Sequence, residues 1–435
     1  MLVSLTIGIL KEAEAGEDRV AAIPDTVKKY KGFSGTTILV EKGAGEKASY
    51  TDASYKEAGA NLSSRSDVLK KSDIVLCVKT PPEKDLGSLK KNALLIGLLN
   101  PHDAGKNIGK WANNNITTLS MEMVPRITRA QAMDVLSSQA NLAGYKAVLD
   151  AANHFTRAFP MMMTAAGTIA PARVFVMGAG VAGLQAIATA KRLGAIVSAT
   201  DVRPAAKEQV ASLGANFIAV EDEEFKQAES AGGYAKEMSK EYQTKQAALV
   251  EDTLTKQDIV ITTALIPGRP APVLLTKKMV ESMKPGSVIV DMAVERGGNC
   301  ELSESDKVVQ KNGVTIIGYK NIPARLATDT SALYAKNIFN LIKLLLDDKG
   351  KLNPDWNDEI LKGMTITHDG NIVHTLFADA ASAKPSSKTT STAAVKKQAA
   401  KKPTSKKTDA KVAKKPKTSK TSKTTKPAKK SGTKK

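Results

Sequence analysis

The 435-residue sequence has few cysteines, few histidines and no long apolar run. Its two cysteines, Cys77 and Cys300, lie far apart, and only four histidines occur. A disulfide framework and a zinc ribbon are therefore excluded, and no metal site is expected. The stretch 158–190 is split by Arg173, two prolines and four glycines, whereas a membrane-spanning helix needs about 20 consecutive apolar residues. With no secretory signal pattern at the N-terminus, the body is expected to be soluble and intracellular.

Acidic and aromatic residues are almost absent from the C-terminal end. Residues 384–435 contain 19 lysines, one acid (Asp409) and no aromatic residue, which gives this segment a net charge of +18 and leaves +2 for the rest. Such a segment cannot bury enough apolar surface to offset the entropy lost on ordering. We therefore predict a disordered Lys-rich tail over 384–435 behind a near-neutral globular body.

Along the body, short β-rich runs alternate with helical patterns, which is typical of parallel sheets covered by helices. One alternating region covers residues 1–140 and a second runs from 173 to 319. Residues 331–345 have helical spacing, and Asp369-Gly370 between two β-rich runs indicates a hairpin. We expect these late elements to return to the first domain.

The predicted fold is thus α/β, with two Rossmann-like doubly wound parallel-sheet domains and a cleft between them. The first domain is predicted to be discontinuous, over 1–140 and 320–383, and the second to span 141–319.

A glycine-rich turn marks the start of the second region. A β-rich run over 173–177 leads into GAGVAG, which carries Gly178, Gly180 and Gly183, and then into a helical run. In a dinucleotide-binding turn the first glycine permits the tight turn, the second lets the backbone approach a pyrophosphate, and the third lets the helix pack on the strand. The next predicted strand ends at Asp201, close to the spacing expected of the acid that binds the adenosine ribose.

The acid favours NAD over NADP, because Asp201 would repel a 2′-phosphate. Arg203 follows two residues later, and an arginine near this position can instead accommodate that phosphate. Since the acid comes first, at the strand end, we expect NAD. The alternative to dinucleotide binding as such is a glycine turn in an α/β sheet that binds no ligand.

Several longer motifs go beyond this general pattern. They are VPRITRAQAMDVLSSQANLAGYKAV (124–148), RVFVMGAGVAGLQAI (173–187), TDVRP (200–204), GGYAKEMS (232–239), TTALIPGRPAP (262–272) and MKPGSVIVDMAVERGGNCE (283–301). With them the chain resembles the NAD(H)-binding alpha component of proton-translocating NAD(P) transhydrogenase, a family related to alanine dehydrogenase.

The resemblance implies a set of site residues. Arg126, Gln131 and Asp134 match the family's nicotinamide-side triad, and Tyr234 matches a mobile loop that closes over the cofactor. The other matching NAD contacts are Val181, Ala182, Asp201, Val202, Arg203, Gly233, Gln246 and Leu265.

The nicotinamide-side residues also have an ordinary structural interpretation. A helical pattern covers 128–152, with Thr128 as the predicted N-cap and Gln131 completing a capping box. Gln131 and Asp134 would then share one helix face. Without the resemblance, Gln131 would be a capping residue and Asp134 a solvated aspartate.

The resemblance also implies an activity and partners. It implies direct hydride transfer from NADH on this subunit to NADP⁺ on a partner subunit, of the Si-Re (AB-specific) type, coupled to proton translocation by a membrane-spanning subunit. Because the chain ends in a polar tail, the membrane and NADP(H)-binding components are expected to be separate chains. A homodimer is implied, peripheral to the cytoplasmic face of an energy-conserving membrane.

Two other functions compete with this interpretation. A stand-alone alanine dehydrogenase would use a lysine, a histidine and an aspartate; Lys79 sits at the lysine position, but Glu295 replaces the aspartate and His102 is three residues out of register. Without that histidine, a 2-amino acid has no proton acceptor as it becomes an imine. A degenerate Rossmann domain tethered to nucleic acid is disfavoured by the intact glycine motif and Asp201.

The tail generates a first prediction. Because a lysine near anionic headgroups gains roughly 1 kcal/mol, full-length protein should sediment with anionic liposomes at low salt. Truncation after Ala383 should abolish this sedimentation. Full-length protein that stays in the supernatant even at low salt would refute the membrane hypothesis. The alternatives for the tail are nonspecific nucleic-acid binding through counterion release and a purely solubilising role.

Overall fold

The computed structural model describes residues 5–228, 238–266, 268–347 and 349–381. Two predicted loop residues, Gly233 and Tyr234, and the predicted tail over 384–435 lie outside these ranges. Within them, none of the helices combines the length and the apolar character that crossing a bilayer requires.

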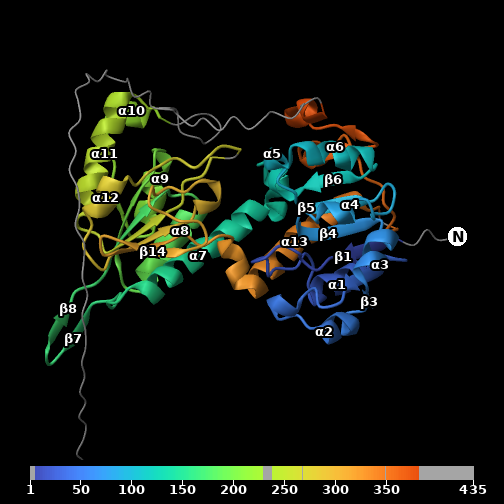
Figure 1. The fold of residues 1–435 in the computed structure, drawn as a ribbon, viewed down its shortest axis with the longest axis horizontal. Helices are drawn as coiled ribbons and strands as arrows, with labels where there is room; N and C mark the ends of the chain where they lie inside the picture. The colour runs from blue at the N-terminus through green and yellow to red at the C-terminus, as the bar shows by residue number, and fades with distance from the viewer. Residues whose placement is uncertain (1–4, 229–237, 267, 348, 382–435) are drawn as a thin grey trace, which may run out of the picture. The chain divides into compact units, whose positions relative to one another are not determined.

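The first lobe is built on an eight-stranded sheet with the order β17-β16-β6-β5-β4-β1-β2-β3 (Figure 1). The six strands from the N-terminal region are mutually parallel, and the two late strands are antiparallel additions at one edge. The strands are β1 (Thr6–Ile9), β2 (Thr37–Glu41), β3 (Asn61–Ser63), β4 (Ile74–Lys79), β5 (Leu94–Leu98), β6 (Thr117–Ser120), β16 (Thr365–His368) and β17 (Asn371–Ile372). The helices are α1 (Pro24–Lys31), α2 (Asp52–Glu57), α3 (Arg65–Lys71), α4 (Glu83–Leu86), α5 (Pro101–Ala104), α6 (Lys106–Asn113), α13 (Ala327–Leu345) and α14 (Glu359–Met364).

The second lobe is built on a seven-stranded sheet with the order β11-β10-β9-β12-β13-β15-β14, parallel except for β14. Its strands are β9 (Arg173–Met177), β10 (Ile196–Thr200), β11 (Asn216–Phe217), β12 (Ile259–Thr262), β13 (Val288–Asp291), β14 (Val308–Lys311) and β15 (Val314–Ile317). Its helices are α8 (Val181–Arg192), α9 (Ala205–Ser212), α10 (Glu223–Lys226), α11 (Lys240–Leu254) and α12 (Lys277–Glu281). The prediction of two parallel-sheet α/β domains is confirmed.

The chain returns to the first lobe after the second sheet is complete. Strand β16 pairs with β6, and β16 and β17 form the predicted hairpin across Asp369 and Gly370. Both turn residues have positive φ, +47° and +76°, as a two-residue type I′ turn requires. Sheet membership therefore agrees with a discontinuous first domain, while the exact domain limits and the cleft stay predictions.

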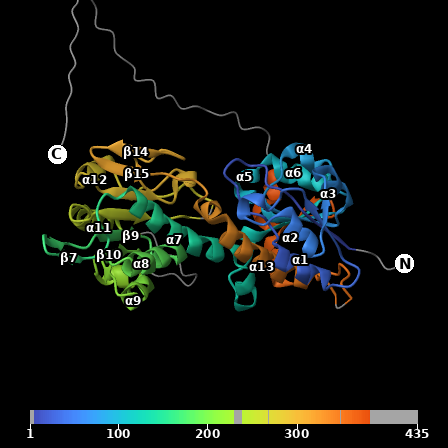
Figure 2. The same cartoon turned by 90° about the horizontal axis from the view of Figure 1, so that it is seen from below.

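The long helix α7 (Val135–His154) contributes to two hydrophobic cores. Its first residue, Val135, packs in the core of the first sheet, whereas Ala147, Val148 and Ala151 pack in the core of the second. It also packs against α13, whose apolar face covers the first sheet (Figure 2). One continuous helix thus connects the two lobes.

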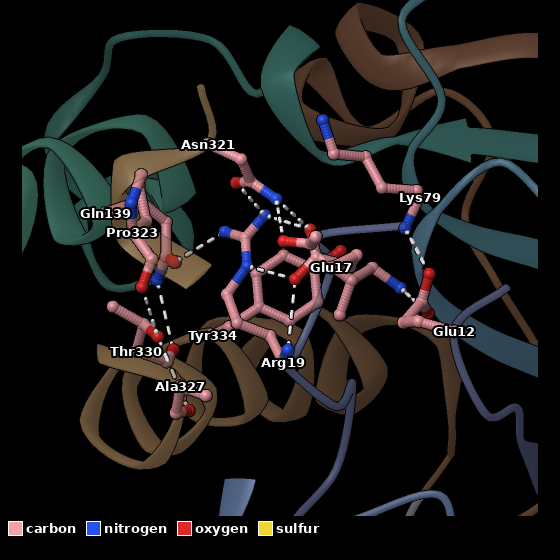
Figure 3. Close-up of polar contacts among 12 residues, drawn as sticks. Glu12, Glu17, Arg19, Lys79, Gln139, Asn321, Pro323, Ala327, Thr330 and Tyr334 are labelled. Atoms are coloured by element: carbon pink, nitrogen blue, oxygen red, sulfur yellow. Dashed lines mark hydrogen bonds and ion pairs between the residues drawn. The ribbon is translucent and has the colours of Figure 1, made fainter. Parts of the chain in front are cut away.

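A buried ion pair ties the N-terminal loop to these helices (Figure 3). The Arg19 guanidinium donates two hydrogen bonds to Glu17, at 2.8 and 2.6 Å, and a third to Gln139 Oε1 of α7 at 2.7 Å. Asn321 donates to Glu17 Oε2 at 2.9 Å, and Gln139 donates to the Thr330 carbonyl of α13 at 3.1 Å. Burial alone would raise the pKa of Glu17, but the hydrogen bonds and charge of Arg19 lower it, so this buried carboxylate stays ionised.

The predicted start of the helix over 128–152 is wrong. Residues Thr128–Met133 form a 3₁₀ helix without a side-chain cap, and α7 begins only at Val135. Its N-cap is Asp134, whose Oδ1 accepts from the Ser137 N–H at 2.9 Å. Because aspartate is among the strongest N-cap residues, it sets the start of the helix, and Gln131 is not part of a capping box.

A two-stranded hairpin formed by β7 (Met162–Thr164) and β8 (Gly167–Ile169) was not predicted. It extends away from the seven-stranded sheet, and its residues are exposed (Figure 1). Sequence patterns missed it because neither strand has a buried face to create alternation.

Candidate nucleotide-binding site

The glycine turn lies at the point where the order of the second sheet reverses. Strand β9 lies inside the sheet, with β10 on one side and β12 on the other. In doubly wound sheets, ligands bind outside the carboxyl ends of the strands at such a point. The turn from β9 into α8 occupies this position.

Each glycine of the turn has a separate geometric role. Gly178 has φ +104°, which disfavours any residue with a side chain. A Cβ on Gly183 would lie 1.8 Å from the Gly178 carbonyl oxygen, so only glycine lets α8 approach the turn this closely. A Cβ on Gly180 would meet nothing within 4 Å, which leaves the surface over the turn open.

The N-terminus of α8 presents backbone N–H groups at this open surface. Its N-cap residue is Gly180, which has no side chain to cap the helix, and its first turn contains no acid. Uncapped N–H groups and the positive end of the helix dipole favour an anionic group here.

Asp201 lies directly beside the turn. Its Oδ2 accepts from the Ala179 N–H at 2.7 Å, and its Oδ1 accepts from the Arg203 N–H and Nε at 2.9 Å each. Arg203 Nη2 bridges Asp201 Oδ2 at 3.0 Å and the Ala179 carbonyl at 3.2 Å. The side chain of Asp201 is only 7% exposed. A nearly buried carboxylate is thus held against the glycine turn by four donors.

Apolar side chains are exposed at the carboxyl ends of three neighbouring strands. Val181 follows β9, Val202 follows β10 and Leu265 follows β12, with exposed fractions of 41%, 51% and 54%. Gln246 of α11 supports the same edge, because its amide joins Thr200 at the end of β10 to the Val220 N–H. Exposed apolar groups around a polar turn are typical of a site that packs against a flat ring.

The segment after β12 is bonded to the glycine turn and to the buried polar residue Asn299, which the sequence analysis did not identify. Thr263 Oγ1 donates to the Gly178 carbonyl at 3.0 Å, and the Ala264 N–H donates to Asn299 Oδ1 at 3.1 Å. Asn299 in turn is held by Asp291 at the end of β13. Nothing in the sequence indicates that Asn299 lies next to Ala264.

The predicted nicotinamide-side residues lie on a different segment. Arg126 and Gln131 are exposed before α7, and Asp134 is half-buried as its N-cap. They are therefore close to one another along the chain, and the structure places them on the first-lobe end of α7.

Helix α7 also touches the start of α8. A Cβ on Gly144 would lie 2.0 Å from the Ala182 carbonyl oxygen, so the two helices cross in close backbone contact. At a rise of about 1.5 Å per residue, Asp134 lies about 15 Å along the helix from this crossing. The helix thus fixes the spacing between the glycine turn and the Arg126–Asp134 segment.

Comparison with known proteins agrees with this geometry. Residues 8–143 match the family described as alanine dehydrogenase/PNT, N-terminal domain, and residues 147–375 match its C-terminal domain. The chain belongs to the alanine dehydrogenase/PNT family. It is 54% identical over 377 residues to the first part of NAD(P) transhydrogenase subunit alpha of Rhodospirillum rubrum, covering 85% of this chain and 98% of that one. A crystal structure of transhydrogenase from Sinorhizobium meliloti matches with 52% identity and a TM-score of 0.78, over 85% of this chain and all of that one.

Alanine dehydrogenases within the family are more distant. Alanine dehydrogenase 1 of Staphylococcus aureus is 27% identical over 388 residues, covering 85% of this chain and 95% of that one.

Lys79, His102 and Glu295, the residues at or near the positions used in alanine dehydrogenation, each make separate contacts in the structure. Lys79 lines a pocket of about 140 Å³ at the ends of β1 and β4, together with Glu12 and Arg65, and no histidine is among the described lining residues. His102 instead packs edge-on against Phe377, with ring centroids 5.2 Å apart. Glu295 is exposed and accepts from the Asn321 N–H.

Glu12 has a structural role in this pocket. Its two carboxyl oxygens accept from the Val78 and Lys79 N–H groups, at 2.7 and 3.1 Å, which joins the end of β1 to the end of β4. Burial raises the pKa of Glu12 to about 7, although these hydrogen bonds oppose the shift.

This shift predicts a pH-dependent stability. Between about pH 4.5 and 7 the unfolded chain loses the Glu12 proton while the folded protein retains it, so the free energy of unfolding should fall as pH rises, by at most about 1.4 kcal/mol per unit. Above about pH 7 the effect should level off. In Glu12→Gln this contribution disappears. Urea denaturation of both proteins at several pH values measures the difference, and two parallel stability curves would refute it.

Proposed function

We propose that this chain is the NAD(H)-binding alpha subunit of a proton-translocating NAD(P) transhydrogenase. The observation that carries the proposal is the glycine turn at the reversal point of the second sheet, with Asp201 held beside it. The similarity to transhydrogenase subunits along nearly their whole length supports this function over alanine dehydrogenation.

In this proposal the second lobe binds the dinucleotide through groups already in position. The N–H groups at the start of α8 receive the pyrophosphate, above the open surface at Gly180. Asp201 accepts the ribose hydroxyls, which replace side-chain donors of Arg203. The apolar contacts come from Val181, Val202 and Leu265. The remaining proposed NAD(H) contacts are Gln246 and Ala182, together with Gly233 and Tyr234, which lie outside the described residues.

The nicotinamide end is proposed to lie toward Arg126, Gln131 and Asp134. Hydride transfer between two nicotinamides needs no general acid or base, only alignment and exclusion of water. An amide and two groups of opposite charge can orient a carboxamide and a ribose without exchanging protons. Helix α7 supports this placement, because Asp134 lies about 15 Å along the helix from its crossing with α8 beside the glycine turn.

The acceptor, NADP⁺, is proposed to bind a separate partner subunit, with transfer of the Si-Re type. A membrane-spanning subunit would couple this transfer to proton translocation. The chain would then be peripheral, at the cytoplasmic face of the energy-conserving membrane. Its similarity to proteins named as one portion of a transhydrogenase subunit alpha supports a multi-subunit assembly.

We also propose a homodimer in which the β7–β8 hairpin contacts a second copy. An isolated two-stranded hairpin is marginally stable in water, so its exposure favours a packing partner. Its apolar side chains support this idea, since Met161, Met162, Met163 and Ile169 are all exposed, Met163 to 78%.

A binding measurement tests the cofactor specificity. Titration of the full chain should detect NADH and not NADPH, because the Asp201 carboxylate repels a 2′-phosphate. Asp201→Ala should cost about 1–3 kcal/mol of NADH affinity through loss of a charged acceptor. Equal affinity for the two cofactors would overturn the assignment, and turnover of alanine with NAD⁺ alone would favour the dehydrogenase alternative.

A kinetic measurement tests the nicotinamide side. Gln131→Ala should leave stability nearly unchanged, because Gln131 is exposed and caps no helix. NADH affinity should also stay nearly unchanged, because the proposed contacts at the glycine turn and Asp201 remain. Hydride transfer to NADP⁺ in the reconstituted complex should slow by about tenfold or more, since alignment is lost. Arg129→Ala, which removes an exposed ion pair with Asp358 nearby, serves as the control and should transfer normally. A normal rate in Gln131→Ala would refute the proposed role.

A further inference from the structure

Asn299 makes an unusual set of contacts for one side chain. It is fully buried, and its amide pairs with both main-chain groups of Ala264: Oδ1 accepts from the N–H at 3.1 Å and Nδ2 donates to the carbonyl at 2.9 Å. Nδ2 also donates to the Pro272 carbonyl at 2.8 Å. The side-chain amide of Asn299 thus makes the two hydrogen bonds with Ala264 that a neighbouring β-strand would make.

The main chain around Asn299 is itself fixed. The Asn299 N–H donates to Asp291 Oδ1 at 3.1 Å, and its carbonyl accepts from the N–H groups of Leu274 and Leu275 at 2.8 and 2.9 Å. The Asp291 carboxylate is fully buried and also accepts from the Cys300 N–H and the Ser303 hydroxyl. Because Asp291 ends β13, a fully buried interior strand, these bonds connect Asn299 to the core of the sheet.

Only an asparagine of this length supplies what the position requires. One atom must accept from an N–H while another donates to two carbonyl oxygens, and a buried group left unpaired would cost about 1–3 kcal/mol. An aspartate lacks the donor, and an apolar side chain lacks both.

The segment that Asn299 holds leads directly into the proposed cofactor site. Thr263, one residue before Ala264, donates to the Gly178 carbonyl of the glycine turn. Leu265 and Ile266, which follow Ala264, are exposed apolar side chains at the carboxyl edge of the sheet. With Ala264 bonded on both sides, the direction of Leu265 is set before any cofactor arrives.

We infer that Asn299 is a positioning residue for the cofactor, acting through Leu265. This inference rests on the proposed NAD(H) function. It adds to the proposed site a residue that lies far along the chain from the glycine motif. Asn299 does not touch the cofactor; it fixes the backbone that presents Leu265 to it. Preorganisation of this kind lowers the entropy lost on binding.

A double-mutant cycle with NADH as the probe tests the inference in the full-length chain. Leu265→Ala should weaken NADH binding several-fold. Asn299→Ala should weaken NADH binding by about tenfold, since the backbone that orients Leu265 is no longer held and the Leu265 contact with the cofactor is lost with it. In the double variant the losses should not multiply, because Leu265 matters only while Asn299 holds it. Asn299→Asp, which keeps the shape and removes the donors, gives the same comparison if the alanine variant does not fold.

Asn312→Ala is the matched control. The Asn312 side-chain amide also donates to a main-chain carbonyl, that of Glu281 at 3.0 Å. However, Asn312 precedes β15 and so lies at the amino ends of the parallel strands, away from the carboxyl ends where the cofactor is proposed to bind. The Asn312→Ala variant should lose stability without losing NADH affinity. Wild-type affinity in both Asn299 variants, or losses that multiply in the cycle, would overturn the inference. If the unmodified chain bound no NADH, the proposed function itself would fail.

Discussion

The close contact between α7 and α8 is the constraint on which most of the molecule depends. It requires glycine at 144, since any side chain there would overlap the Ala182 carbonyl. The same helix packs Val135 in one core and Ala147 in the other, so it cannot shift without disturbing both. The buried bond from Arg19 to Gln139 holds it from the first lobe as well. The distance between the glycine turn and the Arg126–Asp134 segment is therefore a property of one rigid helix.

The site combines a carboxylate with a cation that is already bound to it. Arg203 keeps the almost buried side chain of Asp201 in a fixed orientation through charge-assisted hydrogen bonds. A ribose that displaces those donors must offer hydrogen bonds of its own, whereas a phosphate would bring negative charge against the carboxylate. Selectivity in such an arrangement comes from the penalty on the wrong ligand as much as from attraction to the right one.

Local patterns predicted those parts of the structure whose stability is local. The parallel strands, the glycine turn with its acid and the Asp369-Gly370 hairpin all have signals within a few residues. The predicted start of α7 was wrong because Thr128 and Asp134 both fit an N-cap, and the Thr128–Gln131 spacing resembled a capping box although Asp134 is the residue that caps the helix. Asn299 was missed because its partner, Ala264, lies 35 residues away, and no periodicity encodes a side-chain amide pairing with a distant backbone.

The late hairpin has a consequence for the order in which the chain can fold. Strand β16 pairs with β6 across a sequence separation of about 250 residues, and Tyr334 of α13 donates to the Cys77 carbonyl in the first core. The first sheet therefore cannot be completed until almost the whole body has been synthesised. All strands of the second sheet lie between Arg173 and Ile317, so that lobe has its full set of strands earlier. During translation β6 therefore has an unpaired edge until the C-terminal hairpin is synthesised and pairs with it. An unpaired strand edge promotes aggregation of the nascent chain during this interval.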